Sequence, residues 1–208
     1  MKKKLIAVLG GEGSGKSTQL HLLRKKYSEG QLVLTREPGG SVFGEKIRAL
    51  ALSPDAKGAS AHTQFGLMWA ARHDHMEQLI LPALNEGKHV ITDRFDCCSY
   101  AYQVFAQGGT DLKDLFWQVR EVFLKNRKPD LYIFLDVEPE VGLTRVAKRK
   151  GSEVPNHFDQ QKLDFHQRIR VGYQDFLSRV PHVVIDANRS QEEVTKEFAA
   201  AVDLALAA

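Results

Sequence analysis

One eight-residue segment constrains the fold of this chain more than any other. It has the sequence Gly10-Gly11-Glu12-Gly13-Ser14-Gly15-Lys16-Ser17 and matches the pattern G-x-x-x-x-G-K-[ST]. The apolar run Leu5–Leu9 precedes it, as a buried strand would, and Thr18–Lys26 follows it with leucines at helical spacing. Strand, glycine-rich loop and helix in this order indicate a phosphate-binding loop, because the glycines let successive backbone N–H groups turn toward phosphate oxygens.

Two side chains of this loop have specific predicted roles. Lys16 would reach the β- and γ-phosphates of a nucleotide, and Ser17 would offer its hydroxyl to Mg²⁺. The other predicted nucleotide-binding residues are Gly10, Gly11, Glu12, Gly13, Ser14, Gly15 and Thr18.

Composition narrows the class of protein. The 208 residues, 43% apolar and 26% charged, are typical of one globular domain. A net charge of +3 without a dominant basic tract does not indicate a nucleic-acid binder. We expect no membrane association, because no apolar run approaches the roughly 20 residues of a membrane span and no signal peptide precedes the first strand. The adjacent Cys97 and Cys98 have neither metal-ligand spacing nor the separation of a structural disulfide, so a cytoplasmic location is expected.

Short apolar runs alternate with helical stretches along the chain. The predicted strands are Leu5–Leu9, Leu32–Thr35, Val90–Thr92, Leu131–Leu135 and His182–Ile185. Helices are expected over residues 61–84, with a break near Pro82, and over 97–105, 112–124 and 163–180, with a last amphipathic helix at the end; residues 54–58 are expected to form a loop. This alternation predicts an α/β fold, a parallel sheet with helices on both faces.

Polar residues follow the second and third predicted strands, at the edge where such sheets bind ligands. Arg36 and Arg94 could each hold an anion bidentately, and Asp93 could hold Mg²⁺ through water. A plain turn at Arg36 and a surface ion pair between Asp93 and Arg94 are the alternative interpretations.

The long helical stretch carries Phe65, Met68, Trp69 and Arg72 on adjoining faces. Such an aromatic stripe is usually core, but an arginine within it requires an acceptor. The nearby His62, His73 and His75 have no metal-binding spacing and are expected on the surface.

A basic helix end, residues 145–150, leads into the polar stretch 151–156. This pattern predicts a lid over about residues 145–160 that brings Arg145 and Arg149 to a transferring phosphoryl group. A solvated helix end is the alternative.

Together these residues resemble the thymidylate (dTMP) kinases over nearly the whole chain. The motifs that carry the resemblance are the phosphate loop with Glu12, Arg36-Glu37-Pro38-Gly39-Gly40, Ala70-Ala71-Arg72, Asp93-Arg94, Ala101-Tyr102-Gln103, Leu135-Asp136-Val137 with Gly142-Leu143-Thr144-Arg145, Phe165-His166-Gln167-Arg168-Ile169-Arg170 and Ile185-Asp186-Ala187.

The resemblance implies a three-layer P-loop kinase fold with a five-stranded parallel sheet, residues 1–208 as one kinase domain, and a homodimer. It implies Mg²⁺-ATP as donor, dTMP as acceptor and dTDP as product. By position, Glu12 would lie near the acceptor's sugar, Arg94 and Arg36 would bind the acceptor phosphate, and Arg72 would bind the base. The catalytic residues would be Lys16, Arg94, Arg145 and Arg149. The metal would be bound by Ser17 and Asp93, and residues near Arg189 would lie beside the adenine. The remaining acceptor-site residues would be Glu37, Pro38, Met68, Asp93, Cys98, Ser99, Tyr102 and Gln103.

Four positions depart from the family pattern. Met68 stands where family members carry a phenylalanine that stacks on thymine, and Cys98 where they carry serine or asparagine. Leu9 replaces a glutamate, and Asn156-His157-Phe158-Asp159 replaces the lid's Asp-Arg-x-Glu, which leaves Arg145, Lys148 or Arg149 to supply its charge.

Two alternatives to dTMP kinase activity stay open at this level. One is a kinase for another deoxynucleotide, such as dUMP or a modified pyrimidine. The other is a nucleotide-dependent switch or binding module, against which the second anion site at Arg36, Arg72 and Arg94 and the lack of an Asn-Lys-x-Asp motif argue.

Overall fold

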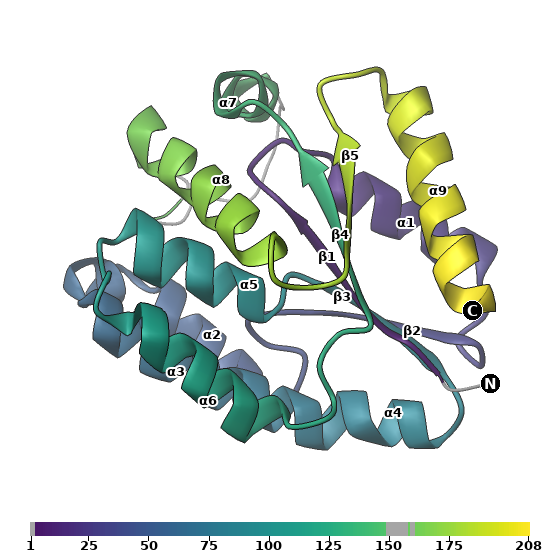
Figure 1. Ribbon diagram of the computed structural model, residues 1–208, viewed down its shortest axis with the longest axis horizontal. Helices are drawn as coiled ribbons and strands as arrows, with labels where there is room; N and C mark the ends of the chain where they lie inside the picture. The colour runs from purple at the N-terminus through teal and green to yellow at the C-terminus, as the bar shows by residue number, and fades with distance from the viewer. Residues whose placement is uncertain (1–2, 149–157, 159–160) are drawn as a thin grey trace.

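The computed structural model describes residues 3–148, 158 and 161–208. Five strands form one parallel sheet in the order β2-β3-β1-β4-β5. Their bounds are β1 Leu5–Gly10, β2 Leu32–Arg36, β3 His89–Asp93, β4 Leu131–Asp136 and β5 His182–Asp186. The carboxyl ends of the strands lie at one edge of the molecule, the upper one in Figure 1.

The central strand β1 is buried on both faces, and its side chains alternate between two cores. Leu5, Ala7 and Leu9 belong to the larger apolar cluster, whereas Ile6 and Val8 belong to the smaller one. A continuous apolar run is therefore what the middle strand of a doubly covered sheet requires.

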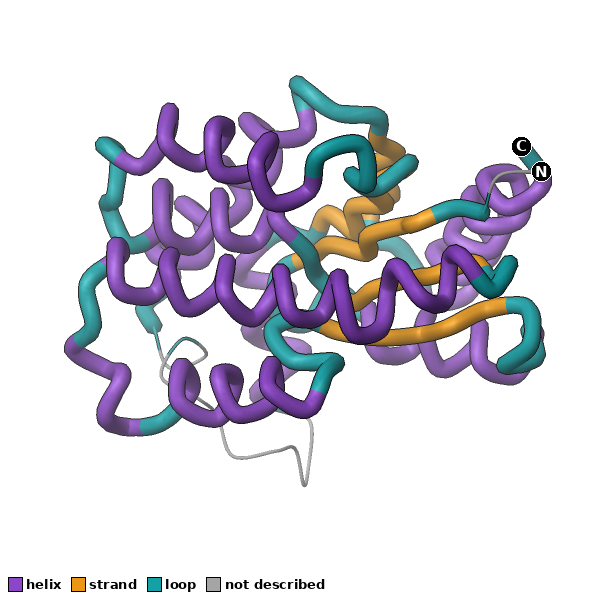
Figure 2. The backbone as a smooth tube through the Cα atoms, turned by 90° about the horizontal axis from the view of Figure 1, so that it is seen from below, coloured by secondary structure: helices purple, strands orange, loops and turns teal. Residues whose placement is uncertain are grey.

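The smaller core is closed by two helices, α1 (Lys16–Lys26) and α9 (Gln191–Ala207), which lie side by side on one face of the sheet (Figure 1). The opposite face carries α3 (Ala61–His75), α5 (Asp96–Ser99), α6 (Leu112–Leu124) and α8 (Leu163–Leu177). Seen along the sheet, helices flank the strands on both sides (Figure 2). The predicted three-layer α/β fold is confirmed.

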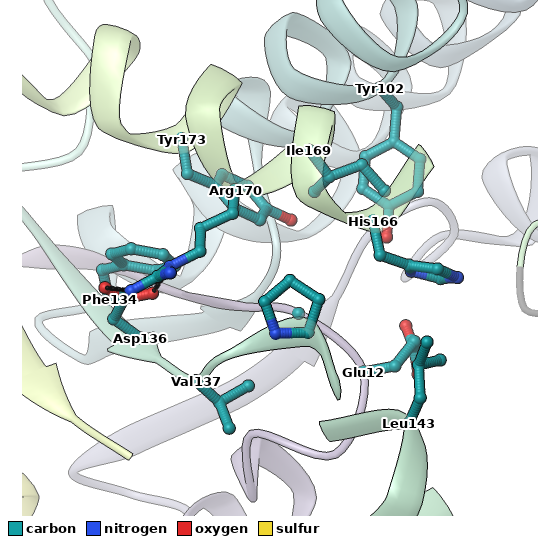
Figure 3. Close-up of a pocket in the computed structure, with 12 residues that line it drawn as sticks. Glu12, Tyr102, Phe134, Asp136, Val137, Leu143, His166, Ile169, Arg170 and Tyr173 are labelled. Atoms are coloured by element: carbon teal, nitrogen blue, oxygen red, sulfur yellow. Dashed lines mark hydrogen bonds and ion pairs between the residues drawn. The ribbon is translucent and has the colours of Figure 1, made fainter. Parts of the chain in front are cut away.

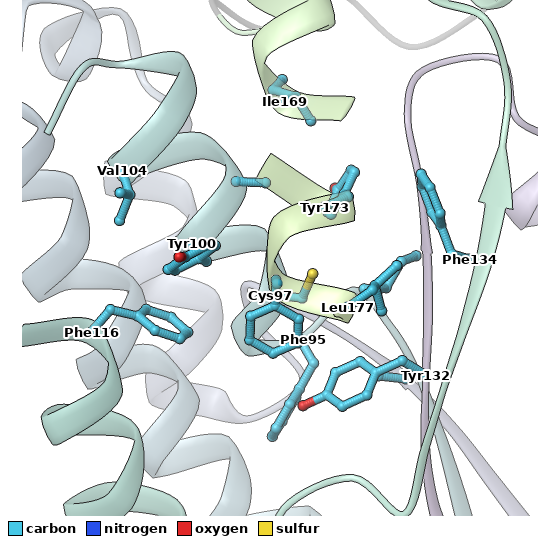
Figure 4. Close-up of a cluster of buried hydrophobic side chains, with 14 of the residues drawn as sticks. Phe95, Cys97, Tyr100, Val104, Phe116, Tyr132, Phe134, Ile169, Tyr173 and Leu177 are labelled. Atoms are coloured by element: carbon cyan, nitrogen blue, oxygen red, sulfur yellow. The ribbon is translucent and has the colours of Figure 1, made fainter. Parts of the chain in front are cut away.

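The larger core is rich in aromatic side chains. Phe95, Phe116 and Tyr132 are fully buried between β4 and the helices (Figure 4). Behind them, Asp96 accepts hydrogen bonds from Arg120 Nε at 2.5 Å and from Tyr132 Oη at 2.7 Å. This buried ion pair ties α6 and β4 to the start of α5, the segment that follows Arg94.

The predicted strands agree with the structure to within one residue at each end. The region 61–84 is helical as expected but is interrupted earlier than Pro82, by the π-turn η2 (Met76–Ile80), before α4 (Leu81–Asn85). The helix expected over 97–105 consists of α5 and the π-helical η3 (Tyr100–Ala106), and α8 ends at Leu177 rather than 180. Helix α7 (Pro139–Ala147) follows β4.

One expectation was wrong, and one helix was not predicted. Residues 54–58 form the 3₁₀ turn η1 (Pro54–Gly58) rather than an open loop. Helix α2 (Val42–Leu52) was not predicted, although Ser41 caps it by accepting a hydrogen bond from Gly44 N at 3.1 Å, and Ile47 and Ala51 are buried one turn apart. In the described part of the chain, no helix is long and apolar enough to cross a membrane.

Candidate active site

The glycine-rich loop lies at the carboxyl end of β1, as its sequence predicts. Gly13 and Gly15 adopt positive φ angles of 69° and 90°, a region that other residues rarely enter. A Cβ on Gly13 would lie 2.1 Å from the carbonyl oxygen of Gly142, so the loop packs directly against α7. The loop then passes into α1, whose first N–H groups lack helical partners and can meet phosphate oxygens.

Lys16 folds back over this loop. Its Nζ donates to the carbonyl oxygens of Gly10 and Gly11 at 2.8 and 3.1 Å. Burial lowers the pKa of Lys16, and the positive charge of Arg94 acts in the same direction. A phosphate anion would favour the charged form of this buried ammonium group, and Lys16 with exposed Ser17 beside it is therefore suited to bind one.

Asp93 and Arg94 lie at the tip of β3, between β1 and β2. Arg94 has a positive φ of 67°, and its backbone N donates to Val8 O at 2.9 Å. Asp93 Oδ1 is buried and has no hydrogen-bond partner among the described residues. An orphaned carboxylate oxygen next to a phosphate loop fits an Mg²⁺ ion, which binds oxygen ligands and keeps several waters.

Arg94 is the centre of a charged cluster. Its guanidinium donates to Glu12 Oε1 at 2.8 Å, Tyr102 Oη at 3.0 Å and Tyr173 Oη at 3.2 Å. Burial opposes ionisation of both groups. The pKa of Glu12 is nevertheless lowered, because the positive charges of Arg94 and Lys16 favour the carboxylate. The pKa of Arg94 is raised, because Tyr102, Tyr173, Cys98 and Glu12 favour its charged form. The guanidinium therefore keeps its charge while lining a cavity.

That cavity, which we call the acceptor pocket after the role that the sequence predicts for its residues, encloses about 900 Å³ of space, part of it open to solvent. Ten of its lining residues were predicted from the sequence: Glu12, Glu37, Pro38, Met68, Arg72, Arg94, Cys98, Ser99, Tyr102 and Gln103. Gln103 is buried, and its Oε1 has no hydrogen-bond partner among the described residues, so it is available to a ligand. Residues from four separate segments thus form one pocket.

Arg72 has the acceptors that its apolar surroundings require. It is 3% exposed, and its Nε donates to Glu37 Oε2 at 2.8 Å. Both terminal nitrogens donate to Ser99 Oγ, at 3.1 and 3.0 Å. The rings of Trp69 and Phe95 lie 4.7 and 5.4 Å from the guanidinium carbon.

Two predicted acceptor-site residues do not line this pocket. Arg36 pairs with Glu45, with both carboxylate oxygens at 3.2 Å, and more than half of its side chain is exposed. Asp93 lies beneath the pocket at the strand tip. The structure adds four lining residues that the sequence did not indicate: Arg48, Leu52, Phe95 and Phe158. Arg48 and Leu52 belong to α2, so the cap at Ser41 was the signal that would have found them.

A second cavity, which we call the donor pocket after the role that the sequence predicts for its residues, borders the later part of the loop and encloses about 700 Å³ of space, part of it open to solvent. Gly13, Ser14, Gly15 and Thr18 line it together with Arg145 and Arg189. Arg145 donates to the carbonyl oxygens of Ala187 at 2.7 Å and Asn188 at 3.3 Å. Arg189 pairs with Glu197 and donates to Asp186 O. Arg149, the other predicted lid arginine, lies outside the described residues.

A narrow cavity with space for about one water molecule lies between Glu12 and helix α8 (Figure 3). His166 and Tyr102 face it, and on its far side Arg170 donates to both oxygens of Asp136, at 2.7 and 3.0 Å. This ion pair joins α8 to the end of β4, next to the loop. Helix α8 is also joined to Arg94, which donates a hydrogen bond to Tyr173.

Comparison with known proteins bears directly on this arrangement. The family model for thymidylate kinase matches residues 8–198. A thymidylate kinase of Rhodopseudomonas palustris is 40% identical over 99% of this chain and 91% of its own length. One of Clostridium novyi is 39% identical over 94% of this chain and 96% of its own. The crystal structure of a thymidylate kinase from Ehrlichia chaffeensis superposes with a TM-score of 0.74 and 28% identity, covering 98% of this chain and 99% of that one.

The resemblance noted in the sequence and the P-loop kinase fold are both confirmed by these matches. The family model, the relatives and the solved structure agree on family and fold. The chain is a phosphotransferase that belongs to the thymidylate kinase family.

Proposed function

We propose that the chain catalyses ATP + dTMP → ADP + dTDP. The single observation that supports this assignment most is that two pockets border the glycine-rich loop, a donor pocket at its later part and an arginine-lined acceptor pocket at Glu12. A phosphate oxygen of dTMP attacks the γ-phosphorus of ATP, the bond from that phosphorus to the bridging oxygen breaks, and ADP leaves.

At the donor side, the loop amides and Lys16 bind the ATP phosphates. Lys16 must leave the carbonyl oxygens of Gly10 and Gly11 to do so, and a phosphate anion is the stronger acceptor. Arg145 and Arg189 border the adenine end. Mg²⁺ would be held by Ser17 and, through water, by Asp93; when bound, it neutralises charge that develops on the phosphoryl oxygens.

At the acceptor side, Arg94 binds the phosphate of dTMP while Glu12 holds Arg94 and faces the sugar. Tyr102 and Gln103 border the nucleoside, and Cys98 and Ser99 lie at its base end. Arg36 can join the phosphate only by leaving Glu45. The acceptor oxygen is already anionic at neutral pH, so the chain's residues contribute position and positive charge rather than a strong general base.

Arg72 selects the base. An arginine only donates hydrogen bonds, so it favours a carbonyl oxygen such as O4 of thymine or uracil over the amino group of cytosine. Met68 gives the base a flexible apolar contact in place of an aromatic face. We therefore propose dTMP or dUMP over dCMP, and nothing in the comparisons favours the alternative kinases or a nucleotide-dependent switch.

Release of ADP, coupled to a spectrophotometric assay and measured with dTMP, dUMP, dCMP, dGMP and dAMP, tests the assignment. We expect the largest kcat/KM with dTMP. A best acceptor other than dTMP would overturn it, and ATP hydrolysis that no monophosphate stimulates would indicate a switch.

We further propose a single kinase domain that works as a homodimer in the cytoplasm. The exposed side chains of Val42, Phe43 and Leu50, 84%, 57% and 54% exposed, form an apolar surface on α2 that a second copy could cover. The catalytic contribution of Arg149 and the lid over residues 145–160 remain part of this proposal. Sedimentation equilibrium tests the dimer.

A further inference from the structure

A chain of buried hydrogen bonds runs behind the base end of the acceptor pocket. Thr35 Oγ1 lies 2.7 Å from His75 Nε2, and His75 Nδ1 lies 3.2 Å from Glu37 Oε1. The other oxygen of Glu37 accepts from Arg72, which continues to Ser99. His75 was expected on the surface, and this was wrong: its side chain is fully buried.

Glu37 divides its two oxygens between two partners. Oε2 holds Arg72 Nε, and Oε1 faces His75 Nδ1. The terminal torsion of a glutamate is soft, so a carboxylate held at one oxygen can swing about its last bond. A carboxylate held at both oxygens has its plane defined. His75 therefore fixes the plane of the Glu37 carboxylate, and with it the direction in which Glu37 accepts the hydrogen bond from Arg72.

His75 itself has little freedom to turn. Its ring is joined to β2 through Thr35, and a Cβ on Gly40 would lie 2.3 Å from Nε2, so the turn after β2 packs onto the ring. A carboxylate oxygen can only accept, so the contact with Glu37 requires Nδ1–H as donor, while Nε2 pairs with the hydroxyl of Thr35.

The orientation of Arg72 has a direct consequence for a ligand. A guanidinium has five N–H groups, and Arg72 directs one at Glu37 and one from each terminal nitrogen at Ser99. One N–H of each terminal nitrogen remains for a base. Because hydrogen bonds weaken steeply with misalignment, a small rotation of the guanidinium would weaken both hydrogen bonds to the base.

We infer that His75 is a positioning residue for base selection, which acts through Glu37 on Arg72 and does not itself touch the nucleotide. This inference rests on the proposed function, because it assumes that Arg72 meets a carbonyl oxygen of the base. A histidine that merely fills the core would contribute to stability and leave the choice of base unchanged.

The test compares three variants of the full-length enzyme. In His75→Leu, we expect KM for dTMP to rise about tenfold and the kcat/KM ratio of dTMP over dCMP to fall about tenfold, with kcat and KM for ATP nearly unchanged. His75→Asn retains a donor close to the Nδ1 position and should preserve the ratio to within about threefold. His62→Leu, on the exposed side of α3 where His62 pairs with Asp111, should change neither quantity.

Calorimetric Kd values for dTMP and dCMP supply the same ratio without turnover. If wild-type enzyme binds dTMP but does not phosphorylate it, the proposed function fails while the Kd ratio still tests His75. A ratio that stays at the wild-type value in His75→Leu, whatever its unfolding temperature, overturns the inference. If His75→Leu does not fold, Thr35→Val, which removes only the far hydrogen bond, decides: a reduced ratio supports the inference, and a wild-type ratio overturns it.

Discussion

The charged side chains at the two ends of the acceptor pocket differ in how deeply they are buried. At the base end, Arg72 and Glu37 are each 3% exposed and are held by hydrogen bonds to each other, to Ser99 and to His75. At the phosphate end, Arg94 and Glu12 are 20% and 26% exposed, and Lys16 rests on carbonyl oxygens that a phosphate would replace. Under the proposed function, choice of base would depend on a buried arginine held by neighbouring side chains, whereas phosphoryl transfer would depend on charges that are able to change partners.

At the phosphate end, the pKa values of two groups depart from their ordinary ranges. Around the loop, the pKa of Lys16 is lowered by burial, and the pKa of Glu12 is lowered because Arg94 and Lys16 outweigh its own burial. For a carboxyl group with a lowered pKa, the stabilisation is present above its ordinary pKa and is lost as pH falls through the folded value. The Glu12–Arg94 pair therefore persists throughout the neutral range.

The largest effect is expected from Lys16→Ala at the phosphate end. Loss of this charge should reduce kcat by at least about a hundredfold, as removal of a single stabilising donor does elsewhere. Because burial disfavours the charged form of Lys16 in the folded state, its removal should not lower the unfolding temperature of the nucleotide-free protein. Stopped-flow phosphoryl transfer and calorimetry measure the two quantities, with Lys25→Ala in the same helix as control. Wild-type turnover in Lys16→Ala would contradict the assignment of the loop.

Arg94→Ala should come next. Removing a charge-assisted contact to the acceptor phosphate should cost about 1.5–3 kcal/mol, roughly a ten- to hundredfold rise in KM for dTMP. KM for ATP should change little. Steady-state kinetics with each substrate varied in turn provides the measurement, and Arg36→Ala provides the matched comparison. A change in KM for ATP alone would show that Arg94 belongs to the donor site.

Met68→Phe alters the base end without touching Arg72. Stacking on an aromatic ring is worth about 1–3 kcal/mol per base, and Met68 already supplies part of that contact. We therefore expect the Kd for dTMP to fall by about fivefold, the equivalent of about 1 kcal/mol. Calorimetric titration measures it. An unchanged affinity would show that the base does not lie against residue 68.

Cys98→Ser should have the smallest effect. The thiol lies 3.2 Å from Tyr173 Oη, and a hydroxyl can make the same neutral contact. KM for dTMP should change by no more than about twofold, the equivalent of a few tenths of a kcal/mol. In the wild type, N-ethylmaleimide should label Cys98 more slowly when dTMP is bound and should spare buried Cys97, which mass spectrometry can follow. Labelling that dTMP does not slow would place the nucleotide away from Cys98.

Much of this protein was determined by its sequence. The glycine spacing of residues 10–17, the runs that became five strands and the need of Arg72 for an acceptor all depend on neighbours a few residues away. Periodicity and backbone conformation are local properties, so a local pattern reports them. Family membership followed from the same short motifs.

Other features depended on the tertiary structure alone. Arg48 reaches the acceptor pocket because α2 lies beside it. Phe158 also lines the pocket, although it is remote in sequence from the other lining residues. His75 has the same sequence character as His73, yet one is fully buried and the other is partly exposed. The reason is physical: Thr35, Glu37, Arg72, His75 and Ser99 come from β2, the turn that follows it, α3 and α5, and only the packing of these segments against the sheet brings their polar atoms within hydrogen-bond distance.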